Sequence, residues 1–171
     1  GIDSVTGGTG NDTYAWDTAG DADVIVEAAL GGTDTIILTD ALSLAGLKFG
    51  ITSAAASANA SLAQIEQLVI DTTTTGTVLS QQVTGLTLAI NELATGTADL
   101  AITVAENGTL DISNFTFATF DYIDSTGTSV AGDAFDDGVD TITITGDGDN
   151  TIIGSSVKDT IDVEEGANNV T

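Results

Sequence analysis

The chain has 171 residues, of which 42% are hydrophobic, and its 26 acidic side chains far outnumber its two lysines, giving a formal net charge of −24. So few cations exclude a surface for nucleic acid or anionic lipid, and no apolar run reaches the roughly 18 residues that cross a bilayer. Because the chain contains no Cys and no His, disulfides, thiolate or imidazole metal sites and the usual catalytic nucleophiles and bases are excluded. We therefore predict that the protein is not an enzyme, and that bound cations offset its self-repulsion.

A short repeat, Gly-x-(Asp/Asn)-x-apolar, occurs six times, and only near the two ends of the chain. Its closing apolar residue recurs after nine residues at the start of the chain, and after ten, nine and nine residues towards its end when a degenerate copy that ends at Ile161 is counted. A shared short period is the signature of stacked structural repeats. The six copies are Gly1–Val5, Gly10–Tyr14, Gly32–Ile36, Gly138–Ile142, Gly148–Ile152 and Gly166–Val170.

The middle of the chain carries no copy of this repeat. It shows the two-residue alternation of β-strands instead, for example at 86–90 and 100–104. Ser61 to Gln64 matches a capping box and predicts one short helix. The abundance of Thr, Val and Ile argues against long helices. The prediction is a single β-rich domain, 1–171, in three segments: 1–36, 37–137 and 138–171.

Residues 7–15, Gly-Gly-Thr-Gly-Asn-Asp-Thr-Tyr-Ala, match every defined position of the nonapeptide GGxGxDxUx, and the chain thereby resembles the RTX, or haemolysin-type, calcium-binding repeat proteins. The resemblance continues through Gly20-Asp21 and Gly32–Ile36, and 65–70 resembles a strand that follows in such proteins. It implies an all-β fold, a parallel β-solenoid (β-roll or β-helix) with RTX-like calcium-binding rungs at both ends. A β-sandwich in the middle section is the alternative.

The resemblance and the acidic composition together predict several bound Ca²⁺ ions, since carboxylate, amide and carbonyl oxygens are the ligands that calcium prefers. The glycines of the repeat would aim carbonyls at the ion, and the Asp would close the site. A plain Asn-Asp turn is the competing interpretation near the N-terminus, and a solvated acidic loop competes around 133–140. In the last third, where Ser155, Val157 and Glu164 stand in place of glycines, weaker calcium sites or purely structural turns are the alternatives. The predicted metal ligands are Asp3, Gly8, Gly10, Asp12, Asp17, Glu27, Asp34, Asp137, Asp140, Asp147, Asp149, Asn150 and Asp159.

We expect a calcium-dependent extracellular structural protein of a bacterial cell surface, exported by type I secretion as its resemblance implies. Both ends of the sequence stop inside a repeat, and a stacked β-structure cut there exposes strand edges. The expected partner is therefore a second copy, joined head to tail in a surface layer (S-layer) or filament, with neither nucleic-acid binding nor membrane insertion. An adhesin or carbohydrate-binding module, and a calcium-binding accessory domain of a secreted enzyme, are the alternatives.

Overall fold

The computed structural model describes residues 4–16, 23–28, 31–39, 44, 47–50, 56–70, 75–92, 98–117, 122–123, 129–130 and 141–171. Strands dominate this part of the chain, and its one helix, α1, spans only Ser80–Val83. The expected all-β class is therefore confirmed. No helix among these residues is long and apolar enough to cross a membrane.

The strands are short, two to six residues each. In chain order they are β1 Ser4–Thr6, β2 Thr13–Trp16, β3 Val24–Val26, β4 Thr35–Leu38, β5 Lys48–Gly50, β6 Ser57–Ala58, β7 Gln67–Ile70, β8 Thr75–Leu79, β9 Ala89–Glu92, β10 Asp99–Val104, β11 Thr109–Asp111, β12 Thr116–Phe117, β13 Tyr122–Ile123, β14 Ser129–Val130, β15 Thr141–Gly146, β16 Thr151–Ile153, β17 Asp159–Val163 and β18 Asn169–Val170.

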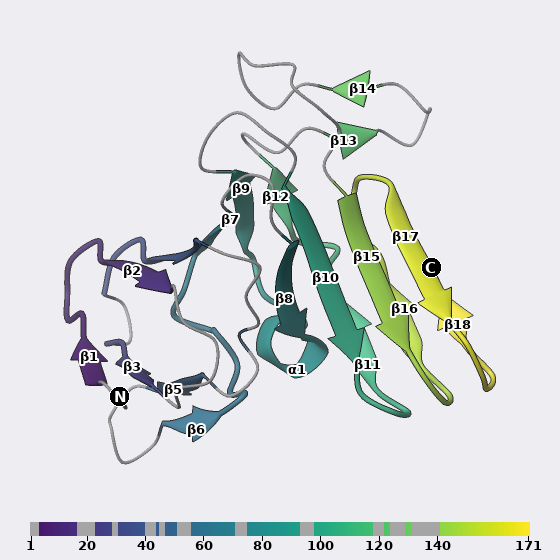
Figure 1. Ribbon diagram of the computed structural model, residues 1–171, viewed down its shortest axis with the longest axis horizontal. Helices are drawn as coiled ribbons and strands as arrows, with labels where there is room; N and C mark the ends of the chain where they lie inside the picture. The colour runs from purple at the N-terminus through teal and green to yellow at the C-terminus, as the bar shows by residue number, and fades with distance from the viewer. Residues whose placement is uncertain are drawn as a thin grey trace.

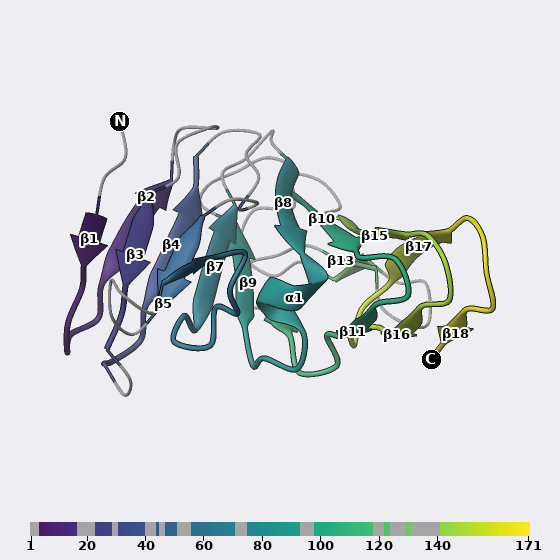
Figure 2. The same ribbon diagram turned by 90° about the horizontal axis from the view of Figure 1, so that it is seen from below.

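The chain alternates between sheets, so the neighbours within a sheet are distant in sequence. Near the N-terminus one sheet has the order β1-β3-β5-β6 and a second has the order β12-β9-β7-β4-β2. Towards the C-terminus the corresponding sheets have the orders β17-β15-β10-β8 and β11-β16-β18. All these pairs are parallel except β5 with β6, and β13 with β14 is also antiparallel. Successive strands follow one another along the long axis from β1 to β18 (Figures 1 and 2).

The core consists of apolar side chains stacked in columns between these sheets. Strand β4 alternates buried and half-buried residues, and its Ile36 lies in register with Leu68 of β7, which lies in register with Ile90 of β9. All three side chains are fully buried. Parallel strands about 4.8 Å apart place residues of one register row in contact. Because β4 spans the predicted boundary at 36/37, the first two predicted segments share one sheet.

The helix predicted from the capping box at Ser61 is wrong, because this segment is a turn. Leu62 and Ile65 are buried there, and the backbone N–H of Leu62 donates to the carbonyl of Gln82 at 2.9 Å. The backbone N–H of Ile65 donates to the carbonyl of Leu62 at 2.8 Å, which closes a single turn, and the chain enters β7 two residues later. Of the two strands predicted in the middle of the chain, 100–104 lies within β10, whereas the pairing expected over 86–90 begins only at Ala89.

Candidate metal centre

Two aspartates, Asp12 and Asp34, occupy equivalent positions at the ends of two successive turns. Asp12 immediately precedes β2, and Asp34 immediately precedes β4. The two strands pair in register from Thr13 and Thr35 onwards. The backbone N–H of Asp12 donates to Oδ1 of Asp34 at 2.9 Å, and the carbonyl of Asp12 accepts from Thr35 at 2.9 Å. The turn that carries Asp12 is thus fixed on the turn that carries Asp34.

Glu27 brings a third carboxylate to the same place. It directly follows β3, and its backbone N–H is anchored to the carbonyl of Gly50 at 3.0 Å. One carboxylate oxygen each of Asp12, Glu27 and Asp34 lies within 4.8 Å of the other two. Glu27 and Asp34 are almost fully buried, with 0% and 1% of their surface exposed, whereas Asp12 is half-buried. We call these three residues the acidic triad.

The hydrogen bonds around the acidic triad leave it short of donors. The Tyr14 hydroxyl donates to Oε2 of Glu27, and Ala28 N–H donates to its Oε1 at 3.1 Å. Oδ2 of Asp12 is buried and has no hydrogen-bond partner. Bringing like charges together in a desolvated site is unfavourable unless opposite charge is supplied. The cluster is therefore arranged for a cation and is poorly arranged to stand alone.

Tyr14 acts as a fixed donor to this cluster. Burial raises the pKa of Tyr14 far above its ordinary value, and the hydrogen bond to Glu27 and the negative charges of Glu27, Asp12 and Asp34 raise it further. The hydroxyl consequently keeps its proton and holds the Glu27 carboxylate in place. The repeat motif predicts only an apolar residue at this position, so the sequence analysis missed this role.

The glycines of the first turn allow close approach to the acidic triad. A Cβ atom on Gly7 would collide with the Tyr14 hydroxyl and with Oε2 of Glu27, and would lie 2.7 Å from Oδ2 of Asp12. The carbonyl oxygen of Gly8 lies 2.8 Å from the point that a Cβ atom on Gly31 would occupy, and Oε1 of Glu27 lies 3.2 Å from the same point. The Gly8 carbonyl therefore lies near the Glu27 carboxylate. The carbonyl of Gly10 instead borders Gly32, together with Oδ1 of Asn11.

Glu66 is a second contributor that the sequence analysis did not single out as a ligand. Its Oε2 accepts a hydrogen bond of 2.8 Å from the backbone N–H of Asp34. Glu66 immediately precedes β7, just as Asp34 precedes β4, so it lies on the next turn of the same stack. No sequence signal marks this role, because it depends on the register between Thr35 and Gln67.

The remaining predicted ligands lie elsewhere. Of these, the described ones belong to the last third of the chain, where Asp147 and Asp149 are exposed and Asn150 is buried. Asp159 opens β17 and accepts hydrogen bonds from Ser155 N–H and Oγ at 2.8 and 2.9 Å, and burial raises its pKa against those bonds. Among the described residues, only the acidic triad brings three carboxylates close enough together to hold a metal ion. Asp3, Asp17, Asp137 and Asp140 lie outside them.

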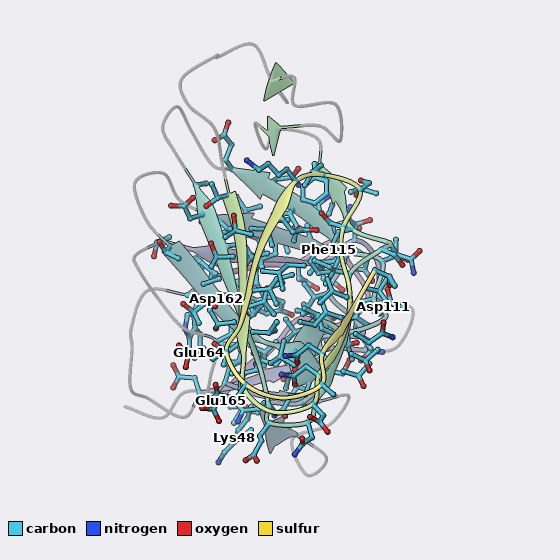
Figure 3. All side chains as sticks on the ribbon, turned by 90° about the vertical axis from the view of Figure 1, so that its right-hand side faces the viewer. Lys48, Asp111, Phe115, Asp162, Glu164 and Glu165 are labelled. Carbon is cyan, nitrogen blue, oxygen red and sulfur yellow. The ribbon has the colours of Figure 1, made fainter. Side chains whose placement is uncertain are left out.

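A shallow acidic depression of about 300 Å³ lies between the ends of β10, β15 and β17. Its walls include exposed carboxylates that do not form a three-ligand group. Figure 3 views the last turns from the C-terminal end, where Asp162, Glu164 and Glu165 follow one another along the last turn. The acidic side chains that line the depression are Glu106, Asp147, Asp162 and Glu164.

The buried carboxylates, the carbonyl beside them and the unpartnered Asp12 oxygen form an oxygen-only site that could hold one metal ion. Such a donor set suits a hard divalent cation. Comparison of the chain with protein-family models, with curated proteins and with solved structures gives no match.

Proposed function

We propose that this chain is a calcium-binding structural module of an extracellular RTX-type protein, with its strands wound as a parallel β-solenoid. The observation that carries the proposal is the acidic triad, in which Glu27 and Asp34 are buried and Oδ2 of Asp12 has no hydrogen-bond partner. The match of 7–15 to the RTX nonapeptide supports the same site. Parallel pairing of β7, β9 and β12 favours a solenoid over a sandwich in the middle section, since β-sandwich sheets are antiparallel.

Calcium fits this site better than magnesium. Calcium accepts six to eight oxygen ligands in flexible geometry, whereas magnesium demands a near-ideal octahedron and retains several waters. The acidic triad and the Gly8 carbonyl come from two successive turns whose spacing is set by strand pairing. A cation with loose geometric demands suits such a site. The negative charge of the acidic triad would attract calcium. A weak affinity would suffice at the calcium concentrations found outside cells, where weakly binding modules function.

Titration with calcium and chelation by EGTA test this proposal. A ligand present at 1,000 times its dissociation constant stabilises the native state by about 4 kcal/mol. We expect heat on titration of calcium chloride by isothermal calorimetry, much weaker binding of magnesium chloride, and a melting temperature that falls in EGTA. An unchanged melt in EGTA, with no calorimetric signal, would exclude calcium as the structural cation.

We further propose that the module joins other modules head to tail. Val5 on β1 and Val170 on β18 are the two exposed large hydrophobic residues of the described chain, at 48% and 45%. They lie on edge strands at opposite ends of the stack (Figure 2). Apolar edge strands favour pairing with another strand. A contact between unlike ends produces a ring or an open filament, as a surface layer or filament requires.

Light scattering and electron microscopy in millimolar calcium separate self-assembly from stacking on a flanking segment. Polymers that dissolve in EGTA are expected, and a chain that stays monomeric at high concentration would exclude head-to-tail assembly of this protein. Three of the described aromatic residues give no support to sugar recognition, whereas Phe117 is half-buried. Trp16, Phe49 and Phe115 are buried at 7%, 1% and 3% exposure, so they cannot stack on a carbohydrate.

A further inference from the structure

The turns near the C-terminus repeat the hydrogen-bond pattern of the metal centre with neutral side chains. At the metal centre, the residue before each strand accepts a bond from its counterpart one turn earlier: Asp34 Oδ1 accepts from Asp12 N–H, and Glu66 Oε2 accepts from Asp34 N–H. In the C-terminal stack, Asn168 Oδ1 accepts from Asn150 N–H at 3.0 Å, and Asn150 Oδ1 accepts from Gly108 N–H at 2.9 Å. The strands that follow are in register, Thr109 with Thr151 and Thr151 with Asn169.

A second ladder, one residue earlier, is also shared. Asn11 Oδ1 accepts from Thr33 N–H at 3.0 Å in the N-terminal stack. Asn107 Oδ1 accepts from Asp149 N–H at 2.9 Å, and Asp149 Oδ1 accepts from Ala167 N–H at 2.7 Å, in the C-terminal stack. The two stacks therefore share both hydrogen-bond ladders. They differ in the charge of the first ladder, which is formed by Asp12, Asp34 and Glu66 in one stack and by Gly108, Asn150 and Asn168 in the other.

The Asn150 amide group does what a carboxylate cannot do. Its Nδ2 donates to the carbonyl of Asp147 at 2.8 Å and to the carbonyl of Gly148 at 3.3 Å, and only 1% of the residue is exposed. The carbonyls that a glycine-rich turn could aim at a cation are thus occupied by a donor of the same chain. No buried negative charge remains in this ladder to attract an ion.

We propose that Asn150 is a specificity-determining residue that makes the 147–150 turn a cation-free counterpart of the calcium site. This inference rests on the proposed function, because it takes calcium to be the ion at the acidic triad. Calcium then stabilises the N-terminal turns, while amide ladders hold the C-terminal turns whether or not calcium is present. Whether this position carries a carboxylate oxygen or an amide NH₂ decides whether calcium or amide hydrogen bonds stabilise the turn.

Hydrogen exchange by mass spectrometry on the full chain tests this, comparing calcium chloride with EGTA. Peptides within 4–16 and 23–39 should exchange about tenfold faster or more in EGTA, because local opening becomes easier. Peptides within 98–117 and 141–171 should change by less than about twofold. A response of 147–150 as large as that of the acidic triad would overturn the inference. A lack of response at the triad would instead overturn the proposed calcium site.

The variant Asn150→Asp tests the assignment to one residue independently of the triad. Its new oxygen would face two carbonyls without a donor, so the turn should lose protection in EGTA and regain it in calcium. Asp149→Asn, one residue away and exposed, keeps its acceptor and is the matched control. Should Asn150→Asp not fold, Asn168→Asp places the same charge at a half-buried position. Absence of a gained calcium response in the folded variant would show that Asn150 does not determine cation binding.

Discussion

The backbone N–H of Asp12 donates a 2.9 Å hydrogen bond to Oδ1 of Asp34, which stands 22 residues later in the chain. This bond engages one oxygen of the Asp34 carboxylate. Oδ2 of Asp12 is buried and has no hydrogen-bond partner. The two carboxylates and that of Glu27 are held within 4.8 Å of one another by strand pairing. The fold thus holds the negative charges close together, and a cation is the group that would relieve their repulsion.

Asp12→Asn should therefore have opposite effects with and without calcium. Loss of one charged ligand is expected to weaken calcium binding about tenfold or more, equivalent to about 1.4 kcal/mol. In EGTA the same variant should melt at a higher temperature than the parent, because one of three repelling charges is gone and the new amide can donate to Glu27. Calorimetry and thermal melts check both signs.

The exposed Asp162 provides the matched control. Asp162→Asn removes the same formal charge at a position outside the acidic triad, on β17. If the two variants weaken calcium binding equally, diffuse charge and not a defined site holds the ion.

Tyr14→Phe should destabilise the calcium-free protein more than the calcium-bound protein. Removing the hydroxyl leaves Oε2 of Glu27 buried without its donor, which costs about 1–3 kcal/mol. A bound cation would satisfy that oxygen and reduce the loss. Urea denaturation in calcium and in EGTA measures both values. A double-mutant cycle with Glu27→Gln isolates the pair, and zero coupling in EGTA would contradict the role assigned to Tyr14.

The core columns predict a contrast between neighbouring residues on one strand. Ile36 is fully buried and stacks on Leu68, whereas the adjacent Ile37 faces the other side of β4 and is half-buried. Ile36→Ala should lower the free energy of unfolding by about 2–5 kcal/mol. Ile37→Ala should cost clearly less, since it removes less buried surface. Comparable losses in urea denaturation would mean that the inward and outward faces of β4 are wrongly assigned.

The half-buried Asp159 is expected to contribute a small decrease in stability as the pH rises. Burial raises its pKa above the ordinary 3.8 despite the hydrogen bonds from Ser155. The folded state then binds its proton more tightly than the unfolded state does, so the contribution of Asp159 to stability is greatest below the ordinary pKa. It is lost as the pH rises from there through the raised folded pKa. The difference in unfolding free energy between the parent and Asp159→Asn should follow this trend, and a difference that grows in the parent's favour with pH would contradict it.

The aspartates of the metal centre could be predicted from sequence because they occupy one position of a short repeat. Glu27 lies outside the repeat and was predicted through the family resemblance alone. Tyr14 and Glu66 could not be assigned their roles, because these depend on which turns are neighbours. Turns that stack are 22 or 32 residues apart at the metal centre, and loops of unequal length conceal that register.

The same limit applies to the last third of the chain, for which the sequence predicts either weaker calcium sites or purely structural turns. Asp149 and Asn150 fit the repeat as well as Asn11 and Asp12 do. The structure shows that a side-chain amide donates to the turn carbonyls at Asn150, which motif matching does not distinguish from a ligand. The helix expected at Ser61 failed for a related reason, since the capping pattern does not reveal that the chain makes a single turn at 62–65 and then enters β7.

Gly7 and Gly10 are both defined positions of the nonapeptide, but the structure predicts that only one must be glycine for steric reasons. A Cβ on Gly7 would collide with the Tyr14 hydroxyl and Glu27 and would press on Oδ2 of Asp12, so Gly7→Ala must displace part of the acidic triad. A Cβ on Gly10 would have no atom within 4 Å. We expect Gly7→Ala to weaken calcium binding about tenfold or more, and Gly10→Ala to bind almost as the parent does. Calorimetric titration of the two variants, with circular dichroism to establish that both fold, decides the matter. Equal losses would mean that the repeat needs its glycines for backbone freedom, and tolerance of Gly7→Ala would place the cation away from the triad.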